Sequence, residues 1–578
     1  MGKRESTKSN SNKKLGEFYT PHCVVTSLYE MINEEFGTEW KNDMVVWDPA
    51  WGTGNLTKEA DFQHLFVSTI RQSDLIRSDG VSDEAMKFQY DFLNDDVDAL
   101  RSVINRITHE YKMPEDLLEY FECGDKDILI LMNPPYAGTG EFGSMSNGTK
   151  ADALVNDIKT MMNDEGLGTA SVNLYSQFIY RVIKMQQAYK KCKIHIAMIC
   201  PPQFLSTDSY QPFRDYIFDN YEFRRAKLIP ANTFENLSGR WGIGLYIWSP
   251  GKTENRNDFM HKAIEYDDAG HEVFVENKII YNLNGYTRAN DWVRDAVDNT
   301  SEKAFIPVLS SGCKAKDELK LGFKHRLGYI GAKGNNIFHN NEGVCLFTSM
   351  YSDGGGIPIM PENFEYACMY FTARRVMTGN NWSWINDKDE YAKPNLESTS
   401  RSVQEAIDKF KVDSLIYALF NTSSHASSLK NIEAVEPNGK RHKGVRVPNE
   451  FFWITKEDAK ELLTDYDAHI SDEMYTFDTE RYMAEQIEKY KNLGAFSNKA
   501  LDILGYANKL YAMTYKYRKE FKSDDGVDYQ VTNWDAGWYQ IKQLVKQYFP
   551  EEFKAFNKMT KDFGEELKPL IYQIGMLR

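Results

Sequence analysis

Three shortages limit what this chain of 578 residues can be. It has no apolar run long enough to span a bilayer as a helix and no signal peptide, so we expect a cytoplasmic protein without a membrane partner. Its seven cysteines show no CxxC pairing and no clustering with histidine, which suggests neither disulfides nor a metal site. Positive charge is also short, because 69 Lys and Arg face 84 Asp and Glu, a net charge of −15.

The most informative residues that are present are Asn133-Pro134-Pro135-Tyr136, which follow the apolar run of residues 127–132. That run predicts a buried parallel strand. The side-chain oxygen of Asn133 and the carbonyl of Pro134 can both accept from one NH2 group, and proline holds such a carbonyl in place. Tyr136 offers a ring on which a planar base can stack. The pattern indicates group transfer to an aromatic amine, with an ordinary strand-end turn as the alternative.

A second pattern lies upstream, in residues 45–56, where an apolar strand runs into a Gly-x-Gly turn and then a helical segment. Gly52 and Gly54 would let the backbone approach a ligand without a Cβ clash. A plain tight turn would explain these glycines alone. Their position one strand-helix series before residue 133 favours a nucleotide-type loop.

Together these segments resemble the amino-methyltransferases that use S-adenosylmethionine. Residues 14–21, which end in Tyr19-Thr20-Pro21, resemble the "G-x-[FY]-[YF]-T-P" segment of DNA adenine methyltransferases of the gamma arrangement. Some RNA and protein-glutamine methyltransferases also carry NPPY, but they would not need some 300 further residues, where sequence-specific DNA enzymes place target recognition. Trp51, at a site that is usually small, and a lengthened loop at residues 138–149 depart from the pattern.

The resemblance implies a set of residues that hold the cofactor. Asp48 would contact its amino acid part, Asp74 the ribose hydroxyls, with Asp79 as a competitor, and Asp91 the adenine amine. A surface aspartate is the alternative for Asp74. The expected cofactor residues are Tyr19, Thr20, Asp48, Pro49, Gly52, Gly54, Asn55, Asp74, Asp91 and Phe92.

The resemblance also extends downstream of the NPPY residues. Residues 173–179 resemble the family's "D-L-Y-x-x-F" helix with Asn for Asp, residues 194–202 a strand that ends near the flipped base, and residues 242–248 a closing antiparallel strand. Phe234 fits a second aromatic side chain against the base, or an ordinary core phenylalanine. The expected catalytic residues are Asn133, Pro134, Pro135, Tyr136 and Phe234.

These features predict an α/β chain with a Rossmann-like class I methyltransferase domain and a mixed α+β, helix-rich C-terminal target-recognition region. We expect a flexible basic tail at 1–14, the catalytic domain at 15–250, target recognition at 251–455 and a helical region at 456–578. Apolar residues recur at helical spacing in residues 483–490, 500–517 and 538–549.

Net negative charge means that local clusters would have to contact DNA phosphates. One cluster follows Pro437 and contains Lys440, Arg441, Lys443 and Arg446. A second consists of Arg374 and Arg375 with Trp382 and Trp384 nearby. Each could equally be a solvated loop or a packed turn.

The sequence therefore predicts a site-specific methyltransferase that moves a methyl group from S-adenosylmethionine to N6 of a flipped adenine in double-stranded DNA, in a restriction-modification or other prokaryotic or phage modification system. One alternative is a methyltransferase subunit of a larger restriction or defence complex that needs a partner protein for DNA binding. Another is a fusion that also cuts DNA, although no paired-carboxylate-plus-lysine signature stands out after the methyltransferase motifs.

Overall fold

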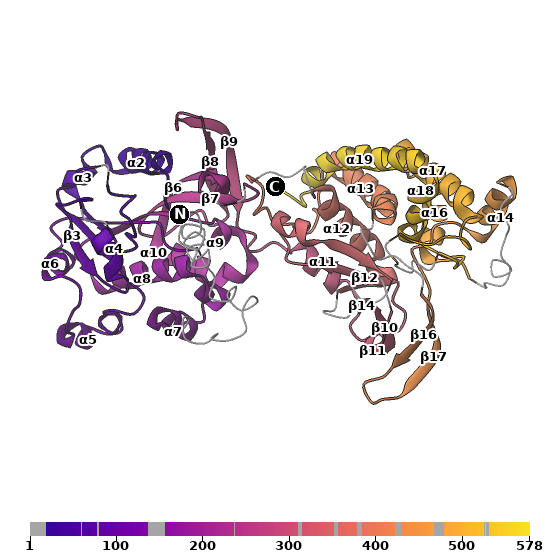
Figure 1. The fold of residues 1–578 in the computed structure, drawn as a ribbon, viewed down its shortest axis with the longest axis horizontal. Helices are drawn as coiled ribbons and strands as arrows, with labels where there is room; N and C mark the ends of the chain where they lie inside the picture. Colours follow the sequence, from indigo (N-terminus) through magenta and orange to yellow (C-terminus); the bar gives the residue numbers. More distant parts are fainter. Residues whose placement is uncertain are drawn as a thin grey trace, which may run out of the picture. The chain divides into compact units, whose positions relative to one another are not determined.

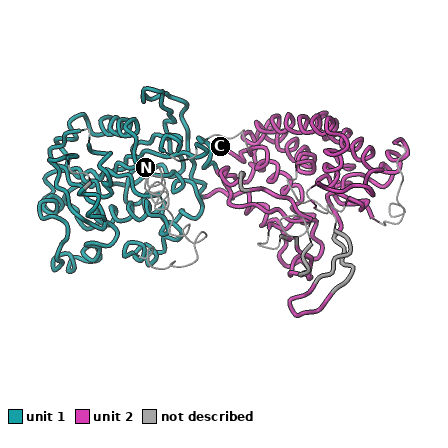
Figure 2. Tube along the Cα trace, in the orientation of Figure 1, with its two compact units in different colours: residues 1–284, 383–389 teal, residues 285–382, 390–578 magenta. Residues whose placement is uncertain are grey.

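The computed structural model describes residues 19–58, 60–77, 80–136, 156–235, 237, 239–309, 315–348, 350–351, 356–378, 384–421, 429–466, 479–524, 526 and 531–578. The chain forms two compact units (Figure 2). Unit 1 consists of residues 1–284 and 383–389, and unit 2 of residues 285–382 and 390–578. No helix among the described residues is long and apolar enough to cross a membrane.

Unit 1 is built on a nine-stranded sheet with the order β3-β2-β1-β4-β5-β7-β6-β8-β9. Strands β3, β2, β1, β4 and β5 pair in parallel, whereas β7 is antiparallel to both of its neighbours. The strands are β1 Val45–Asp48, β2 Leu65–Thr69, β3 Met86–Gln89, β4 Ile128–Met132, β5 Ile194–Cys200, β6 Tyr221–Pro230, β7 Gly242–Pro250, β8 Asp258–Tyr266 and β9 Glu272–Tyr281.

The central strands are buried along their whole length because helices cover both faces of the sheet. Alternate residues separate two cores: Val46 and Leu129 pack with residues of α2, while Trp47 and Ile130 pack with residues of α6, α8 and α10. The helices of unit 1 are α2 His22–Phe36, α3 Trp40–Asp43, α4 Gln72–Arg77, α5 Val103–Thr108, α6 Glu115–Cys123, α7 Asp157–Asp164, α8 Leu174–Ala188, α9 Gln203–Ser206 and α10 Gln211–Asn220.

The boundary of unit 1 lies at residue 284 and not near 250, because β8 pairs in parallel with β6 and β9 extends the same sheet. Residues 383–389 return to unit 1 from far along the chain. There Trp384 and Ile385 pack against Leu228 and Ala263, and Lys278 forms an ion pair with Asp389 at 2.6 Å. This short segment therefore completes the core beside β6 and β8.

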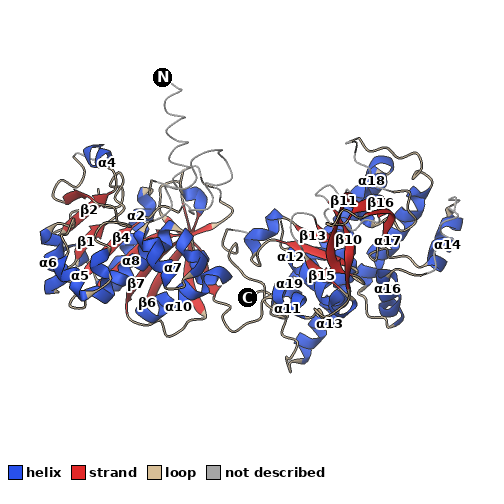
Figure 3. Cartoon of the chain, turned by 90° about the horizontal axis from the view of Figure 1, so that it is seen from below, coloured by secondary structure: helices blue, strands red, loops and turns tan. Residues whose placement is uncertain are grey.

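Unit 2 combines two small sheets with a helical core. Figure 3 shows β10, β11 and β16 side by side, in a sheet of order β14-β10-β11-β16-β17, and β13-β12-β15 form the second sheet. One hydrophobic core joins residues from Ala289 to Leu577, so no boundary falls near residue 455. The strands are β10 Lys303–Leu309, β11 Ala315–Phe323, β12 Gly328–Ala332, β13 Val344–Phe347, β14 Met350–Tyr351, β15 Ile357–Ile359, β16 Leu429–Val435 and β17 Arg441–Val447.

Most helices in the described part of unit 2 follow residue 400 (Figure 1), and apolar residues recur at helical spacing in this part of the sequence. They are α11 Ala289–Asp295, α12 Phe364–Val376, α13 Arg401–Phe420, α14 Lys456–Asp465, α16 Tyr482–Asn492, α17 Asn498–Tyr515, α18 Trp538–Tyr548 and α19 Pro550–Gln573. The predicted mixed and helix-rich character of the C-terminal region is confirmed.

Candidate active site

The two motifs singled out in the sequence meet at one edge of the sheet of unit 1. Strands β1 and β4 pair in parallel, with Trp47 opposite Ile130. Asp48 ends β1 and Asn133 directly follows β4, so both lie at the carboxyl edge. The chain runs outward from β1 to β2 and β3 and then returns to β4, which makes this pair the topological switch point. Open α/β sheets bind their ligands at such a point.

Asp48 is a buried acid with one unused oxygen. The side chain is 1% exposed, and its Oδ1 accepts a hydrogen bond from the Ala50 backbone N–H at 3.0 Å. The Oδ2 atom is buried without a hydrogen-bond partner among the described residues. Burial raises the pKa of Asp48 to about 8, against the lowering effect of the Ala50 N–H. A cationic ligand group fits such an orphaned oxygen, because it would supply the missing partner.

The glycine turn after Asp48 has the conformation that its residues predict. Gly52 and Gly54 have φ of +55° and +79°, in the left-handed region that favours glycine. A Cβ on Gly54 would also lie 2.9 Å from Val81 Cγ1 and 3.0 Å from the Trp51 ring. Trp51 is buried under the turn and donates its indole N–H to Thr57 Oγ1 at 2.8 Å. The unusual tryptophan thus supports the turn by packing. The neighbouring Pro49 is buried and Asn55 half-buried.

The predicted adenine-binding step after β3 is a tight turn held from behind by a buried arginine. Asp91 accepts hydrogen bonds from the Leu93 backbone N–H at 3.0 Å and from Asn94 Nδ2 at 2.7 Å. Phe92 turns into the core and stacks on Phe178. Its ring is therefore not open to the cofactor. Arg181 of α8, which sequence reasoning missed, donates to the Phe92 carbonyl at 2.6 Å.

Asp74 lies in α4 rather than at the end of a strand. Strand β2 ends at Thr69, whose hydroxyl lies 3.5 Å from Asp74 Oδ2. The carboxylate therefore stays close to the carboxyl end of β2, where a ribose contact is expected. Its competitor Asp79 lies outside the described residues.

Asn133 is held on both sides of its amide. Its Nδ2 donates to Thr20 Oγ1 at 2.9 Å, and its Oδ1 accepts from the Tyr136 hydroxyl at 2.6 Å. Thr20 is buried and precedes the N-terminal cap of α2, whereas Tyr19 is exposed. The contact between Thr20 and Asn133 joins residues 113 positions apart, so no local pattern could reveal it. This contact holds the amide NH2 toward Thr20, so the amide oxygen points toward Tyr136.

The remaining aromatic and proline residues differ in exposure. Tyr136 packs against both cores of the sheet, and burial raises its pKa well above the usual value. Pro134 is buried and Pro135 half-buried. Phe234 is 1% exposed within the core that contains α2, which matches the alternative of a core phenylalanine rather than an open base contact. The long loop at 138–149 lies outside the described residues.

The two predicted DNA-contact clusters differ in exposure. Lys440 and Arg441 are exposed at the turn of a hairpin formed by β16 and β17. Lys443 and Arg446 lie in β17, but their side chains are outside what the structure describes, as are Trp382 and the basic tail at 1–14.

The predicted DNA contact by Arg374 is wrong, because its side chain is 0% exposed within unit 2. Its guanidinium donates to the Gly334 carbonyl at 2.7 Å, the Lys333 carbonyl at 2.9 Å and Asn340 Oδ1 at 3.0 Å. All of these acceptors belong to unit 2 and the side chain itself is buried, so Arg374 is a structural residue and not a surface contact. Arg375, in the last turn of α12, is half-buried.

Comparison with known proteins finds one family, and no curated protein matches the chain. Residues 5–74, which include β1 and the glycine turn, match the family model of the N-6 DNA methylases. Among solved structures, a type I restriction-modification methyltransferase subunit from Streptococcus thermophilus is 18% identical, with a TM-score of 0.29 over 47% of this chain and 53% of that chain.

Two further structures are similar at a comparable level. A modification subunit of a putative type I restriction enzyme from Vibrio vulnificus is 13% identical, with a TM-score of 0.27 over 46% of this chain and 51% of that chain. A putative class I S-adenosylmethionine-dependent methyltransferase from Listeria monocytogenes is 13% identical, with a TM-score of 0.25 over 41% and 62%. The chain thus spans about half the length of the restriction-system subunits.

The strand order of the sheet identifies the fold of unit 1. The order β3-β2-β1-β4-β5-β7-β6 with an antiparallel β7 is that of class I methyltransferases. The matched family consists of methyltransferases, and its model covers the strand and turn that end in Asp48, Gly52 and Gly54. Unit 1 therefore has a class I methyltransferase fold, with S-adenosylmethionine as its cofactor.

Proposed function

We propose that unit 1 transfers the methyl group of S-adenosylmethionine to N6 of an adenine in double-stranded DNA, in the gamma arrangement of motifs. The observation that carries the proposal is the position of Asn133 beside the Asp48 turn, at the switch point between β4 and β1. An amide oxygen that accepts from an amine thus lies next to the cofactor turn.

Asp48, Gly52 and Gly54 would hold the cofactor. The orphaned Oδ2 of Asp48 fits its cationic amino acid part, and the two glycines let the backbone come close. Bound S-adenosylmethionine supplies a methyl group on a sulfonium, which is already a good leaving group. The residues of the chain then have to orient the amine and accept hydrogen bonds from it. This requires neither a strong general base nor a metal.

Asn133, Pro134 and Tyr136 would act on the flipped adenine. The ring of Tyr136 provides the stacking surface. Asn133 Oδ1 and the Pro134 carbonyl each accept a hydrogen bond from the N6 amine. The Tyr136 hydroxyl now occupies Asn133 Oδ1, so it has to give up or share that acceptor when the base enters. Thr20 keeps the amide NH2 on the opposite side.

Unit 2 would supply DNA recognition through the hairpin of β16 and β17. This hairpin projects from the body of unit 2 (Figure 1), and Lys440 and Arg441 stand exposed at its turn. A two-stranded ribbon is narrow enough to enter the major groove. Phosphate contacts by the two cations would position it there.

The net charge of −15 supports a second candidate, in which the chain is the methyltransferase subunit of a larger restriction or defence complex. Because polyanion binding draws on a basic surface, an acidic chain would gain most of its DNA affinity from a basic partner protein. In both cases the chemistry belongs to unit 1.

Replacement of Asn133 by alanine tests the chemistry. The loss of one preorganised acceptor should lower the methylation rate of adenine-containing duplex about 10²- to 10³-fold, while cofactor affinity in calorimetry stays within about twofold. Genomic DNA from cells expressing each variant should show N6-methyladenine only with the intact chain. Near-full methylation by Asn133→Ala would contradict the proposal.

A further inference from the structure

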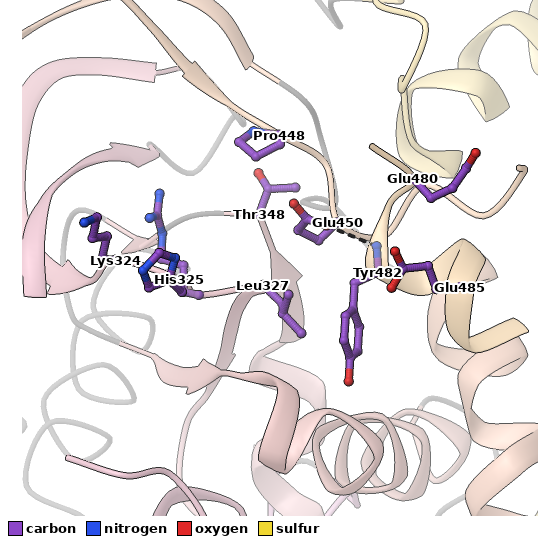
Figure 4. A pocket seen from close by; sticks show the side chains of 10 residues that line it. Lys324, His325, Leu327, Thr348, Pro448, Glu450, Glu480, Tyr482 and Glu485 are labelled. Carbon is purple, nitrogen blue, oxygen red and sulfur yellow. Dashed lines mark hydrogen bonds between the residues drawn. The ribbon is translucent and has the colours of Figure 1, made fainter. Parts of the chain in front are cut away.

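Unit 2 contains a cavity of about 410 Å³ that none of the predicted site residues lines. It lies where the turn between β11 and β12 faces the start of α16 (Figure 4). Most of its lining side chains are charged or polar. Its size suits a side chain or a small ligand, and its lining favours a polar group over an apolar one.

Three carboxylates, those of Glu450, Glu480 and Glu485, line the cavity. Figure 4 shows Glu450 and Glu485 on either side of the Tyr482 backbone, with Glu480 at the far end. Glu450 accepts the Tyr482 backbone N–H at 3.1 Å, and Glu480 accepts that of Lys456 at 3.0 Å. Within the described parts of the chain, none of the three forms an ion pair, and Glu480 Oε2 is buried without a partner.

The basic residues of the lining, Lys324, His325 and Arg326, all come from the turn between β11 and β12. Lys324 forms an ion pair at 2.8 Å with Glu302, which does not line the cavity. His325 lies 3.8 Å from the same Glu302, and Arg326 keeps its positive charge at neutral pH although burial lowers its pKa. On the acidic side, burial raises the pKa of Glu480, and the charges of Glu457, Glu485 and Glu488 add to the effect. Among the residues that the structure describes, unpaired negative charge is therefore found on the side of the cavity formed by Glu480 and Glu485, away from Lys324 and His325 (Figure 4).

Two further features suit a planar cation. Thr348 is 2% exposed and lines the cavity, and its hydroxyl has no partner among the described residues. The half-buried ring of Tyr482, which packs edge to face on Phe364 at 4.8 Å, forms another part of the lining. A carboxylate, a free hydroxyl and an aromatic ring are the groups that a guanidinium uses.

We propose that this cavity binds an arginine side chain of a basic partner protein. Carboxylates bind guanidinium in a two-pronged geometry, and buried arginine anchors often dominate interfaces. A chain of net charge −15 that acts on DNA gains phosphate affinity from a partner with a basic surface, and such a surface is rich in arginine. The three carboxylates would repel the phosphate of a nucleotide. The choice of a basic partner rests on the proposed action on DNA, whereas binding of the arginine side chain in unit 2 does not depend on methyl transfer.

Saturation-transfer NMR on the full chain tests the proposal with N-acetyl-arginine amide as the probe. N-acetyl-citrulline amide has nearly the same shape without the charge and serves as the matched ligand. Glu485 is exposed and makes no described hydrogen bond, so Glu485→Gln should fold normally, which thermal unfolding checks. Glu488→Gln, on the same helix but outside the lining, is the matched control.

The arginine probe should bind and the citrulline probe should not. Glu485→Gln should weaken binding about fivefold or more, as expected for the loss of a close charge partner, and Glu488→Gln by less than about twofold. Equal binding of both probes, or equal effects of the two substitutions, would overturn the proposal. Competition by deoxyadenosine monophosphate would do so as well, because it would identify a nucleotide site. None of these outcomes bears on the Asn133 test.

Discussion

At the scale of single residues, the protonation of Asp48 links cofactor binding to pH. Its pKa of about 8 in the free protein means that most Asp48 is protonated at neutral pH. A cationic ligand favours the ionised form, so binding should release a proton. Affinity for S-adenosylmethionine should therefore rise from pH 6 to pH 8, by up to about tenfold per unit. It should level off above pH 8, where the cofactor's own α-amino group loses its proton.

Calorimetry in buffers of different ionisation enthalpy measures that proton directly. Asp48→Asn keeps the shape but does not titrate, so its weaker cofactor binding should be flat between pH 6 and pH 8. A wild-type affinity that is equally flat would show that Asp48 does not face the cation.

The hydroxyl and the ring of Tyr136 have separable roles. Tyr136→Phe removes the hydrogen bond to Asn133 Oδ1 and keeps the stacking surface, whereas Tyr136→Ala removes both. We expect Tyr136→Phe to methylate within about fivefold of the wild type, and Tyr136→Ala to lose base capture, since stacking is worth about 1–3 kcal/mol per base. A 2-aminopurine at the target reports unstacking by fluorescence. Equal defects in the two variants would contradict a stacking role.

The positions of Asp48 and Asn133 at strand ends could be predicted from the sequence, whereas their roles stay predictions. Asp48 and Asn133 each follow an apolar run, and parallel strands bring such positions to one edge. Arg374 was placed wrongly because its burial depends on Asn340 and on carbonyls some 40 residues away. The contact between Thr20 and Asn133 and the hydrogen bond from Arg181 to the Phe92 carbonyl could not be predicted either, because each joins residues far apart in the sequence.

At the scale of elements, the basic stretch after Pro437 is the turn and second strand of a hairpin and not a free loop. Gly439, at φ +87°, allows the tight turn, and Asn438 Oδ1 accepts from the Lys440 backbone N–H at 2.9 Å. Lys440 and Arg441 are thus presented at a fixed place on a ribbon. Their charge can be read from the sequence but this geometry cannot, because strand pairing depends on distant residues.

Replacing Lys440 and Arg441 together by alanine should weaken DNA binding about equally for all sequences. The slope of log affinity against log salt should fall by about one unit for each phosphate that the variant no longer neutralises. Titration of a labelled duplex at several salt concentrations measures this slope. Lys558→Ala changes an exposed lysine on α19 and should leave the slope unchanged. The same small change in both variants would move DNA contact away from the hairpin.

The order of the central strands could be predicted better than the edges of the sheet. Residues 45–48, 128–132 and 194–200 are buried throughout, as the central strands of a parallel sheet require. Strand β9 has a mostly exposed surface, so its apolar pattern is weak and the sequence predicts an end of the catalytic domain near 250. Its pairing with β8 carries unit 1 to residue 284.

At the scale of the whole molecule, residues 384–389 should stabilise unit 1. They do so although residues 285–382, which belong to unit 2, separate them from the rest of unit 1 along the chain. Trp384→Ala would remove a large side chain from the core with Leu228 and Ala263, at a cost of about 3–5 kcal/mol. In calorimetric unfolding it should lower the transition that S-adenosylmethionine raises. Trp538→Ala, in the core of unit 2, should lower the other transition. The reverse assignment would contradict the division into units.

This returning segment has a consequence for synthesis on the ribosome. Domains generally fold as they emerge, from the N-terminus onward. The methyltransferase sheet, however, lacks Trp384, Ile385 and Asp389 until residues 285–382 have also been made. A nascent chain interrupted between residues 285 and 382 therefore carries an unfinished unit 1. The path of the chain itself therefore disfavours release of a working methyltransferase before residues 285–382 of unit 2 have been made.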